Sequence, residues 1–155
     1  MNKGIYKEFD YMDGDYRFVG TFIKLGYRCG YVGVPKSHPW YGKTYDDAGP
    51  DEVQCHWGLT YTGDGRHFLP EDDDSNFWYF GFDCGHCCDA EDCETAKRYG
   101  LVNDKEYLYM KAFEHDLTDA MSKDGLEFTL KDQKFVEDNC KLIAAQLRVA
   151  EKENN

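Results

Sequence analysis

Residues 16–34, YRFVGTFIKLGYRCGYVGV, decide the fold of this chain. The segments 16–24 and 27–34 are rich in the aromatic and β-branched residues that favour strands, and Leu25-Gly26 between them is typical of a short turn. Because both strands and the turn follow one another directly, the stretch predicts a β-hairpin.

Two later segments extend the predicted sheet. Residues 53–61, VQCHWGLTY, alternate between apolar and polar side chains, which is typical of a half-buried strand. Residues 76–84, NFWYFGFDC, are strongly aromatic and predict a central strand that is covered on both faces. Together with the hairpin, these segments predict a mainly antiparallel sheet of about four strands.

The pattern after residue 84 is helical. It predicts a short helix over 90–99, a second over 104–121, and a third that begins behind Thr129 and Asp132 and ends near residue 151. Apolar residues of the third helix are spaced for one buried face. The sequence therefore predicts an α+β fold, with C-terminal helices packed on the sheet, in a single domain over 1–155.

The net charge of −12 is concentrated in one stretch. Residues 46–94 hold fourteen acidic residues and one basic residue, Arg66. Such a surface repels nucleic-acid phosphate, so direct DNA or RNA binding is not expected, whereas a basic protein surface would be attracted. The run Glu71-Asp72-Asp73-Asp74 is the predicted acidic partner surface, and the simplest alternative is that this charge only provides solubility.

The expected location is the cytoplasm. No apolar run approaches the length of a membrane span, and the N-terminal residues lack the apolar stretch of a signal peptide. Seven cysteines, an odd number, favour reduced thiols or metal ligands over a disulfide framework.

Side chains capable of chemistry gather where the predicted strands end. If the third and fourth strands pair, these groups would converge at one edge of the sheet. The predicted functional cluster is His38, His56, Asp83, Cys84, His86 and Asp89.

Three kinds of site fit this cluster. His38, His56 and His86 could bind zinc or another divalent metal with one carboxylate, although no fixed ligand motif is present. A structural zinc knuckle would use Cys84 and Cys87. Catalysis by a Cys84 thiolate is the least favoured, because Asp83 and Asp89 beside the thiol would raise its pKa. The alternative to all three is hydrogen-bonded histidines and packed thiols.

The runs at 26–47, 53–63 and 77–89 resemble a family of small uncharacterised proteins encoded by phages and prophages of Gram-positive bacteria. The shared motifs are Tyr-Arg-Cys, Val-Pro-x-x-His-Pro, His-x-Gly-Leu-Thr-Tyr and Gly-Phe-Asp-Cys-x-His. This chain differs from the family at Trp57 and at Cys87-Cys88. The resemblance implies a phage accessory role in the cytoplasm of the host bacterium and carries no known activity.

Two functions are therefore predicted. The first is an accessory protein that acts by binding, as an anti-defence inhibitor that is either anti-CRISPR-like or nucleotide-sequestering, with a host defence protein or a small nucleotide as its partner. The alternative is a small metal-dependent hydrolase or nucleotide-processing enzyme that uses the His/Asp/Cys cluster. The sequence leaves the oligomeric state open.

Overall fold

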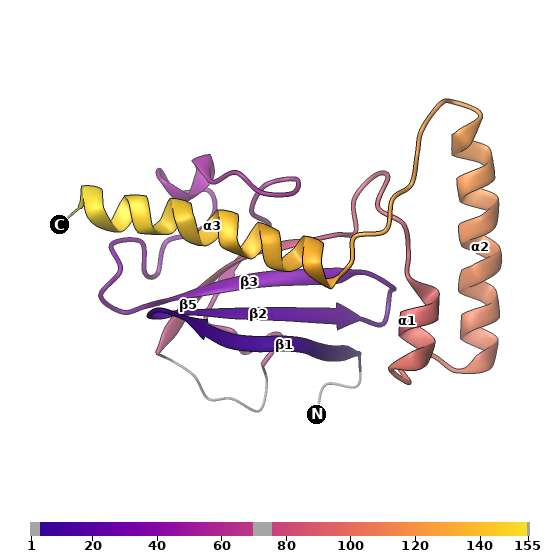
Figure 1. The fold of residues 1–155 in the computed structure, drawn as a ribbon, viewed down its shortest axis with the longest axis horizontal. Coiled ribbons are helices and arrows are strands. Elements are labelled where there is room, and N and C mark those ends of the chain that lie inside the picture. Colours follow the sequence, from indigo (N-terminus) through magenta and orange to yellow (C-terminus); the bar gives the residue numbers. More distant parts are fainter. Residues whose placement is uncertain (1–3, 70–75, 155) are drawn as a thin grey trace.

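A computed structural model describes residues 4–69 and 76–154 of the chain (Figure 1). Its centre is an antiparallel sheet in the order β1-β2-β3-β5-β4. The five strands are β1 (Ile5–Asp13), β2 (Tyr16–Ile23), β3 (Arg28–Pro35), β4 (Tyr61–Gly63) and β5 (Phe77–Asp83). The predicted α+β class, with a mainly antiparallel sheet and C-terminal helices, is confirmed.

The β2–β3 hairpin forms where the sequence predicts it. Gly26 has a φ of 97° and donates its amide hydrogen to the carbonyl oxygen of Ile23 over 2.9 Å, which closes the turn. Both strands lie between β1 and β5 in the sheet and are buried along almost their whole length, because their side chains enter a core on each face. This hairpin is therefore the centre of the fold.

Two predictions about strands are wrong. The first strand, β1, was not predicted, because charged residues interrupt its apolar pattern and a bulge between Lys7 and Phe9 shifts its register. The predicted strand over 53–61 does not form, and only Tyr61–Gly63 pairs with β5. Within this segment Trp57 has a φ of 61°, which lies outside the extended region and ends the alternation.

The three helices follow the sheet as predicted, at α1 (Cys93–Arg98), α2 (Asp104–Ser122) and α3 (Gln133–Glu153). Helix α3 lies across one face of the sheet (Figure 1). Its side chains contact inward-facing residues of the strands, and the buried ones are Val136, Cys140, Ile143, Ala144, Leu147 and Ala150. Their spacing places them on one side of the helix, which is the stripe that the sequence shows.

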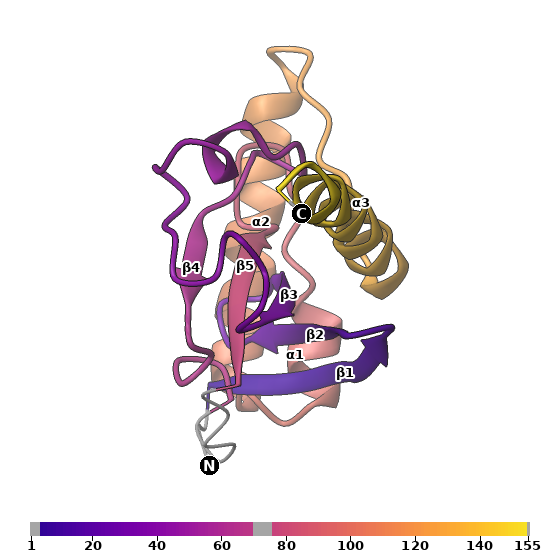
Figure 2. The same cartoon turned by 90° about the vertical axis from the view of Figure 1, so that its left-hand side faces the viewer.

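The opposite face of the sheet carries a second, smaller core. Tyr31 and Tyr79 lie on this face, where Phe68 stacks on Tyr31 with 3.6 Å between ring centroids. In Figure 2, β4 lies beside β5 at the left of the sheet, and α3 is seen nearly along its axis at the right. Both faces of β5 are thus covered, as its aromatic sequence predicts.

A buried ionic cluster ties the sheet to α1. Arg28 of β3 contacts Glu8 of β1 over 2.7 Å and Asp92 over 3.1 Å. Asp92 also caps α1, because it accepts a hydrogen bond from the amide of Thr95. Since all three charged side chains are at least nine-tenths buried, this cluster fixes where the chain leaves the sheet.

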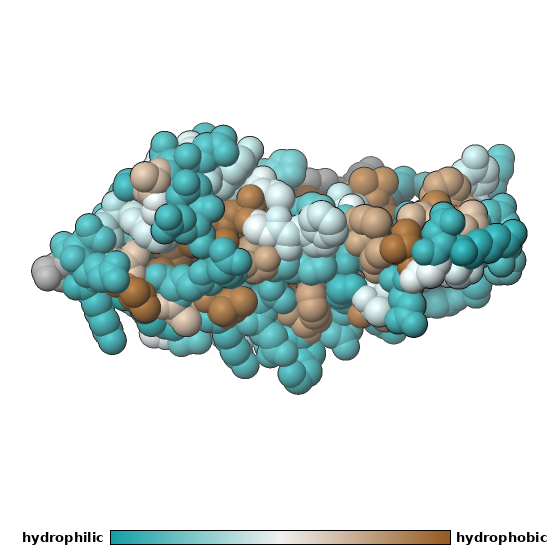
Figure 3. Space-filling view, turned by 90° about the horizontal axis from the view of Figure 1, so that it is seen from above, coloured by the Kyte–Doolittle hydropathy of each residue, from teal (hydrophilic) through white to brown (hydrophobic). Residues whose placement is uncertain are grey.

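Helix α2 stands apart from the sheet at the α1 end of the molecule (Figures 1 and 2). None of its side chains is buried, and Leu108, Tyr109 and Phe113 are more than half exposed. In Figure 3, hydrophilic residues cover most of the face above α3, and hydrophobic residues form patches between them and at the α2 end. Over residues 4–69 and 76–154, no helix has both the length and the apolar character that crossing a bilayer requires.

Candidate functional site

The candidate site is built around the end of β5. Asp83 is the last residue of that strand, and the chain then turns so that the amide of Asp89 donates to the carbonyl oxygen of His86 over 3.1 Å. Asp89 also accepts a hydrogen bond from the amide of His86 over 3.0 Å. The turn therefore holds one imidazole and one carboxylate in a fixed relation.

His56 reaches this turn from the segment that precedes β4. Its Nε2 atom lies 2.9 Å from both carboxylate oxygens of Asp89. The backbone amide of His56 donates to Asn139 of α3 over 2.9 Å, and its ring contacts Phe135 edge-on. Helix α3 thus positions His56, and the predicted convergence of His56 with Asp89 is present although the predicted strand is not.

Lys131 completes the contacts of Asp89. Its ammonium nitrogen lies 3.1 Å from the carboxylate, whose side chain is only 1% exposed. Burial raises the pKa of Asp89, but hydrogen bonds from His56, the His86 amide and Lys131 outweigh burial and hold the pKa below its usual value. Asp89 is consequently an ionised, buried carboxylate that organises the site.

A second imidazole–carboxylate pair lies beside the first. His86 Nε2 is 3.1 Å from Asp83 Oδ1, although this approach does not satisfy hydrogen-bond geometry. Asp83 accepts hydrogen bonds from the hydroxyl of Thr60 and the amide of Gly85. The rings of His56 and His86 are 6.1 Å apart, so the two pairs form one cluster.

Trp57 covers this cluster from the solvent side. Its indole stacks on His86 with 5.1 Å between ring centroids, yet it remains 60% exposed. The positive φ of Trp57 places the ring at the surface. The alternation of residues 53–61 would instead place it on the apolar, buried face of a strand. A non-glycine residue held in this conformation is typical of functional segments.

His38 does not belong to the cluster. It is buried at the far end of α3, where Nε2 donates to the carbonyl oxygen of Leu147 over 2.8 Å and Nδ1 accepts from the amide of Trp40 over 2.9 Å. Burial lowers the pKa of His38, which favours this neutral form. The prediction that His38 joins His56 and His86 is wrong, because its two ring nitrogens are used to fix the loop that follows β3 to α3.

The predicted metal site is therefore not assembled. Within the described part of the chain, no three His, Cys, Asp or Glu side chains lie together with the geometry of a metal site. The zinc-knuckle alternative fails in the same way, since Cys84 is buried and Cys87 is exposed. The predicted acidic surface at 71–74 lies outside the described residues.

Cys84 lies at the cluster but is not available as a nucleophile. Burial raises the pKa of its thiol, and the nearby charges of Asp89 and Asp83 raise it further. Its side chain packs in the core beside α3 instead. The least favoured of the sequence-based hypotheses is thus opposed by both the burial and the charge of its surroundings.

Comparisons of the chain with protein-family models, with curated proteins and with solved structures found no match. The resemblance to a phage-encoded family consequently stays a prediction. Function has to be argued from the geometry of the molecule itself.

Sequence reasoning missed the residues that α3 and its approach contribute. Lys131 and Asn139 lie far along the chain from His56 and carry no motif. The only sign of these two residues in the sequence is that they are polar and lie in or just before an amphipathic helix. The structure shows that the Lys131 side chain is only 14% exposed, and a lysine buried to this extent is usually paired with an acidic group.

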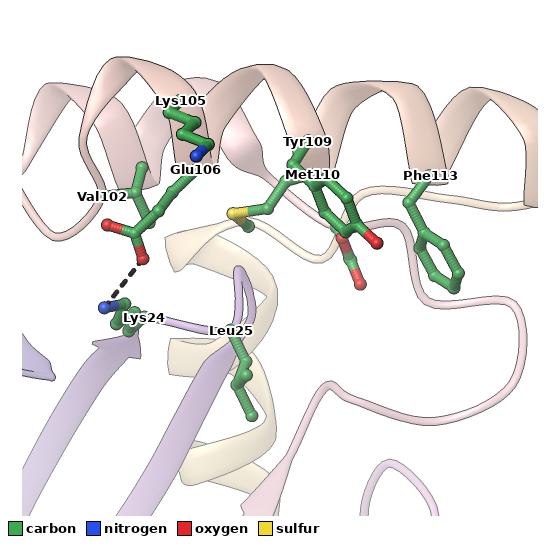
Figure 4. Close-up of a pocket in the computed structure, with 9 residues that line it drawn as sticks. Lys24, Leu25, Val102, Lys105, Glu106, Tyr109, Met110 and Phe113 are labelled. Atoms are coloured by element: carbon green, nitrogen blue, oxygen red, sulfur yellow. Dashed lines mark ion pairs between the residues drawn. The ribbon is translucent and has the colours of Figure 1, made fainter.

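Among the cavities beside α2, two lie between this helix and other elements of the fold. The larger, about 830 Å³, is an apolar groove between α2 and the tip of the β2–β3 hairpin, where Lys24 pairs with Glu106 at its rim (Figure 4). The smaller, about 350 Å³, lies between α2 and the turn after β5. Residues of the turn, among them His86, Cys87, Cys88 and Asp89, line the smaller cavity, which places it directly beside the His–Asp cluster.

Proposed function

We propose that this protein acts by binding a partner with a basic surface, and that residues 46–57 form the binding segment. The observation that carries this proposal is that the acidic side chains at the start of this segment are exposed and make no ion pair with any residue that the structure describes. The segment ends in the exposed indole of Trp57. Together they offer negative charge and an aromatic anchor on one continuous stretch of chain.

Apart from the partly exposed Glu91, the described carboxylates of the acidic stretch 46–94 fall into two groups. Some of its carboxylates lie within ion-pair distance of Lys, Arg or His side chains of the molecule, and these are Asp64, Asp83, Asp89, Asp92 and Glu94. The other group is exposed and makes no ion pair with any residue of 4–69 or 76–154: Asp46, Asp47, Asp51 and Glu52. Within the stretch 46–94, the exposed carboxylates without a basic partner among the described residues therefore lie together in one loop.

Helix α3 holds the binding segment in place. The Gln54 amide donates to the side chain of Gln146 over 2.7 Å, and Gln146 in turn donates to the carbonyl oxygen of Gln54. The amide of His56 is fixed by Asn139. A segment that is ordered before it binds loses less conformational entropy on binding, which favours affinity.

Trp57 gives the segment its anchor. Aromatic side chains dominate the binding energy of many protein interfaces, and tryptophan is enriched among them. An exposed indole also attracts the guanidinium groups that a basic surface carries. The partner class that fits is a protein with an arginine- and lysine-rich surface, such as the nucleic-acid-binding surface of a host defence protein in the cytoplasm.

The test compares two variants with the same change in charge. One carries D46N, D47N, D51N and E52Q, and the control neutralises exposed carboxylates on and after α2 (D116N, D119N, D124N and E127Q). Binding to a fluorescein-labelled arginine-rich peptide, and to purified nucleic-acid-guided nucleases, is measured from 50 to 300 mM NaCl. We expect the loop variant to bind about 30-fold more weakly, because the small binding free energies of four solvent-screened charge contacts add up to this loss. We also expect the affinity of this variant to depend much less on the salt concentration.

The outcome that contradicts the proposal is an equal loss in both variants, or binding that does not depend on salt. Trp57→Ala provides a second measurement, because it leaves the charge unchanged. We expect it to weaken binding to the nucleases more than binding to the flexible peptide, since only a folded surface offers a pocket for the ring.

A second candidate function is hydrolysis by acid–base chemistry. It is favoured by the two imidazoles 6.1 Å apart, each beside a carboxylate, which is an arrangement that orients histidine for proton transfer. Incubation with a set of nucleotide phosphoesters, followed by chromatography, tests it. Turnover that is lost in both His56→Ala and His86→Ala would support hydrolysis, whereas nucleotide binding without turnover would indicate sequestration.

A further inference from the structure

The turn after β5 holds two adjacent thiols side by side. Because the amide of Asp89 donates to the carbonyl oxygen of His86, Cys87 and Cys88 are the two central residues of this turn. Cys88 has a φ of 70°, as the third residue of a type II turn does, although glycine is usual there. The two Sγ atoms lie 3.6 Å apart.

These two thiols differ from the others in their access to small molecules. All seven cysteines are free, and all seven lie within the described segments. Cys87 is exposed and Cys88 is partly exposed, and both line the cavity of about 350 Å³ beside α2. The remaining five are buried or partly buried: Cys29, Cys55, Cys84, Cys93 and Cys140. Of these, Cys84 borders the same cavity but is only 2% exposed.

We propose that Cys87 and Cys88 are a redox modification site, at which a low-molecular-weight disulfide such as glutathione disulfide produces a disulfide between these neighbouring residues. The proposal is independent of the binding function proposed above. It goes beyond it because it assigns chemistry to residues that the binding segment does not contain.

The reaction proceeds in two exchange steps. The Cys87 thiolate attacks glutathione disulfide, forms a mixed disulfide and releases one glutathione thiolate. The Cys88 thiolate then attacks Cys87 Sγ and releases the second glutathione thiolate. The two protons lost by the cysteines are taken up by the two glutathione thiolates, so two protein thiols are oxidised and one glutathione disulfide is reduced to two glutathione molecules.

The surroundings favour this order of attack. The hydrogen bond between the two thiols raises the pKa of Cys88, so that Cys88 retains its proton while the exposed Cys87 reacts first. Cys88 is then 3.6 Å from the sulfur that it must attack, and no large movement of the chain is needed. A ring closed between adjacent residues is strained, which makes the bond readily reducible.

Oxidation would change the neighbouring surface. The same turn carries His86, on which Trp57 stacks, and Asp89, which holds His56. Drawing the sulfurs from 3.6 Å to a bond of about 2.05 Å has to alter the backbone of the turn. The redox state of the pair is thereby coupled to the position of the exposed indole.

The experiment counts thiols in the whole protein. Wild type is equilibrated with a fixed ratio of glutathione disulfide to glutathione, quenched with acid, denatured, alkylated with iodoacetamide and weighed by mass spectrometry. The test variant is Cys88→Gly, which removes the second thiol and suits the positive φ, and Cys55→Ser is the matched control away from the turn. Circular dichroism confirms that each variant is folded.

We expect wild type to fall from seven alkylated cysteines to five without retaining glutathione, and dithiothreitol to restore all seven. Cys55→Ser should lose two alkylations in the same way, and peptide mapping should place the disulfide at 87–88. Cys88→Gly should instead accumulate one glutathione on Cys87. The proposal is overturned if wild type keeps seven thiols, retains glutathione as Cys88→Gly does, or forms disulfides between molecules.

Discussion

Replacing Asp89 by Asn tests whether the buried carboxylate organises the cluster. The side chain is 1% exposed and receives contacts from His56 at 2.9 Å, the His86 amide at 3.0 Å and Lys131 at 3.1 Å. Asparagine keeps one acceptor oxygen, but its NH₂ group would face a second donor. The ammonium of Lys131 would also lose its counter-ion.

The expected loss can be worked from these contacts. Removing one partner of a buried ion pair costs about 3–5 kcal/mol, and a hydrogen bond to a charged group contributes about 1.5–3 kcal/mol. Lys131 recovers part of this, because it also donates to Thr129 and its side chain is 14% exposed. We therefore expect D89N to lower the free energy of unfolding by about 3 kcal/mol at pH 7.

The loss should depend on pH in one direction. The folded pKa of Asp89 lies below its ordinary value of 3.8, so the native state binds fewer protons than the unfolded state as the pH falls. The stabilisation is complete above the unfolded pKa and disappears as the pH drops through the folded pKa. The difference between wild type and D89N should accordingly be smaller at about pH 3 than at pH 7.

Urea denaturation followed by tryptophan fluorescence measures both quantities. Asp83→Asn is the matched control, because the Asp83 side chain is 25% exposed and its partners can turn to water. We expect the control to lose less than about 1 kcal/mol. The reasoning is refuted if D89N is no less stable than D83N, or if the difference between D89N and wild type stays constant from pH 7 to pH 3.

Three other substitutions test single features of the fold, each measured by thermal or urea unfolding. His38→Ala should lose about 2 kcal/mol, because it leaves the Trp40 amide without its acceptor and removes a buried hydrogen bond to the Leu147 carbonyl, but it should not weaken binding to a basic partner. Cys88→Gly should raise Tm by about 3 °C, since glycine adopts a φ of 70° without strain. Gly30→Ala should lose about 1–3 kcal/mol, because the added Cβ would meet the side chains of Phe82 and Val136.

The fold was predictable where local signals and tertiary packing agree. The hairpin over 16–34 carries both a turn and strand-forming side chains, and the helices carry one apolar stripe or clear ends. A turn with Gly14 joins β1 to β2, and such a turn indicates a hairpin. The charged residues of β1, however, interrupt the apolar alternation by which a strand is predicted from sequence. Residues 53–61 alternate without being a strand, because hydrophobic alternation does not report a backbone turn at Trp57.

The sequence predicted most of the residues that form the candidate site, but it did not predict how they are arranged in space. His56, Asp83, His86 and Asp89 do meet, because the segment before β4 and the end of β5 lie at the same edge of the sheet. His38 does not, since its loop passes over the opposite end of α3. Distances between residues remote in sequence depend on packing, which no spacing of residues encodes.

The detachment of α2 has a consequence for how the native molecule opens. A helix that buries no side chain is held by its capping box at Asn103, its own backbone hydrogen bonds, contacts with α1 and exposed ion pairs such as Lys24–Glu106. Its amides should therefore exchange with deuterium through excursions far less costly than global unfolding, while the amides of β3 and β5 exchange only when the whole sheet opens. The molecule is thus expected to consist of a slow-exchanging centre with one fast-exchanging appendage.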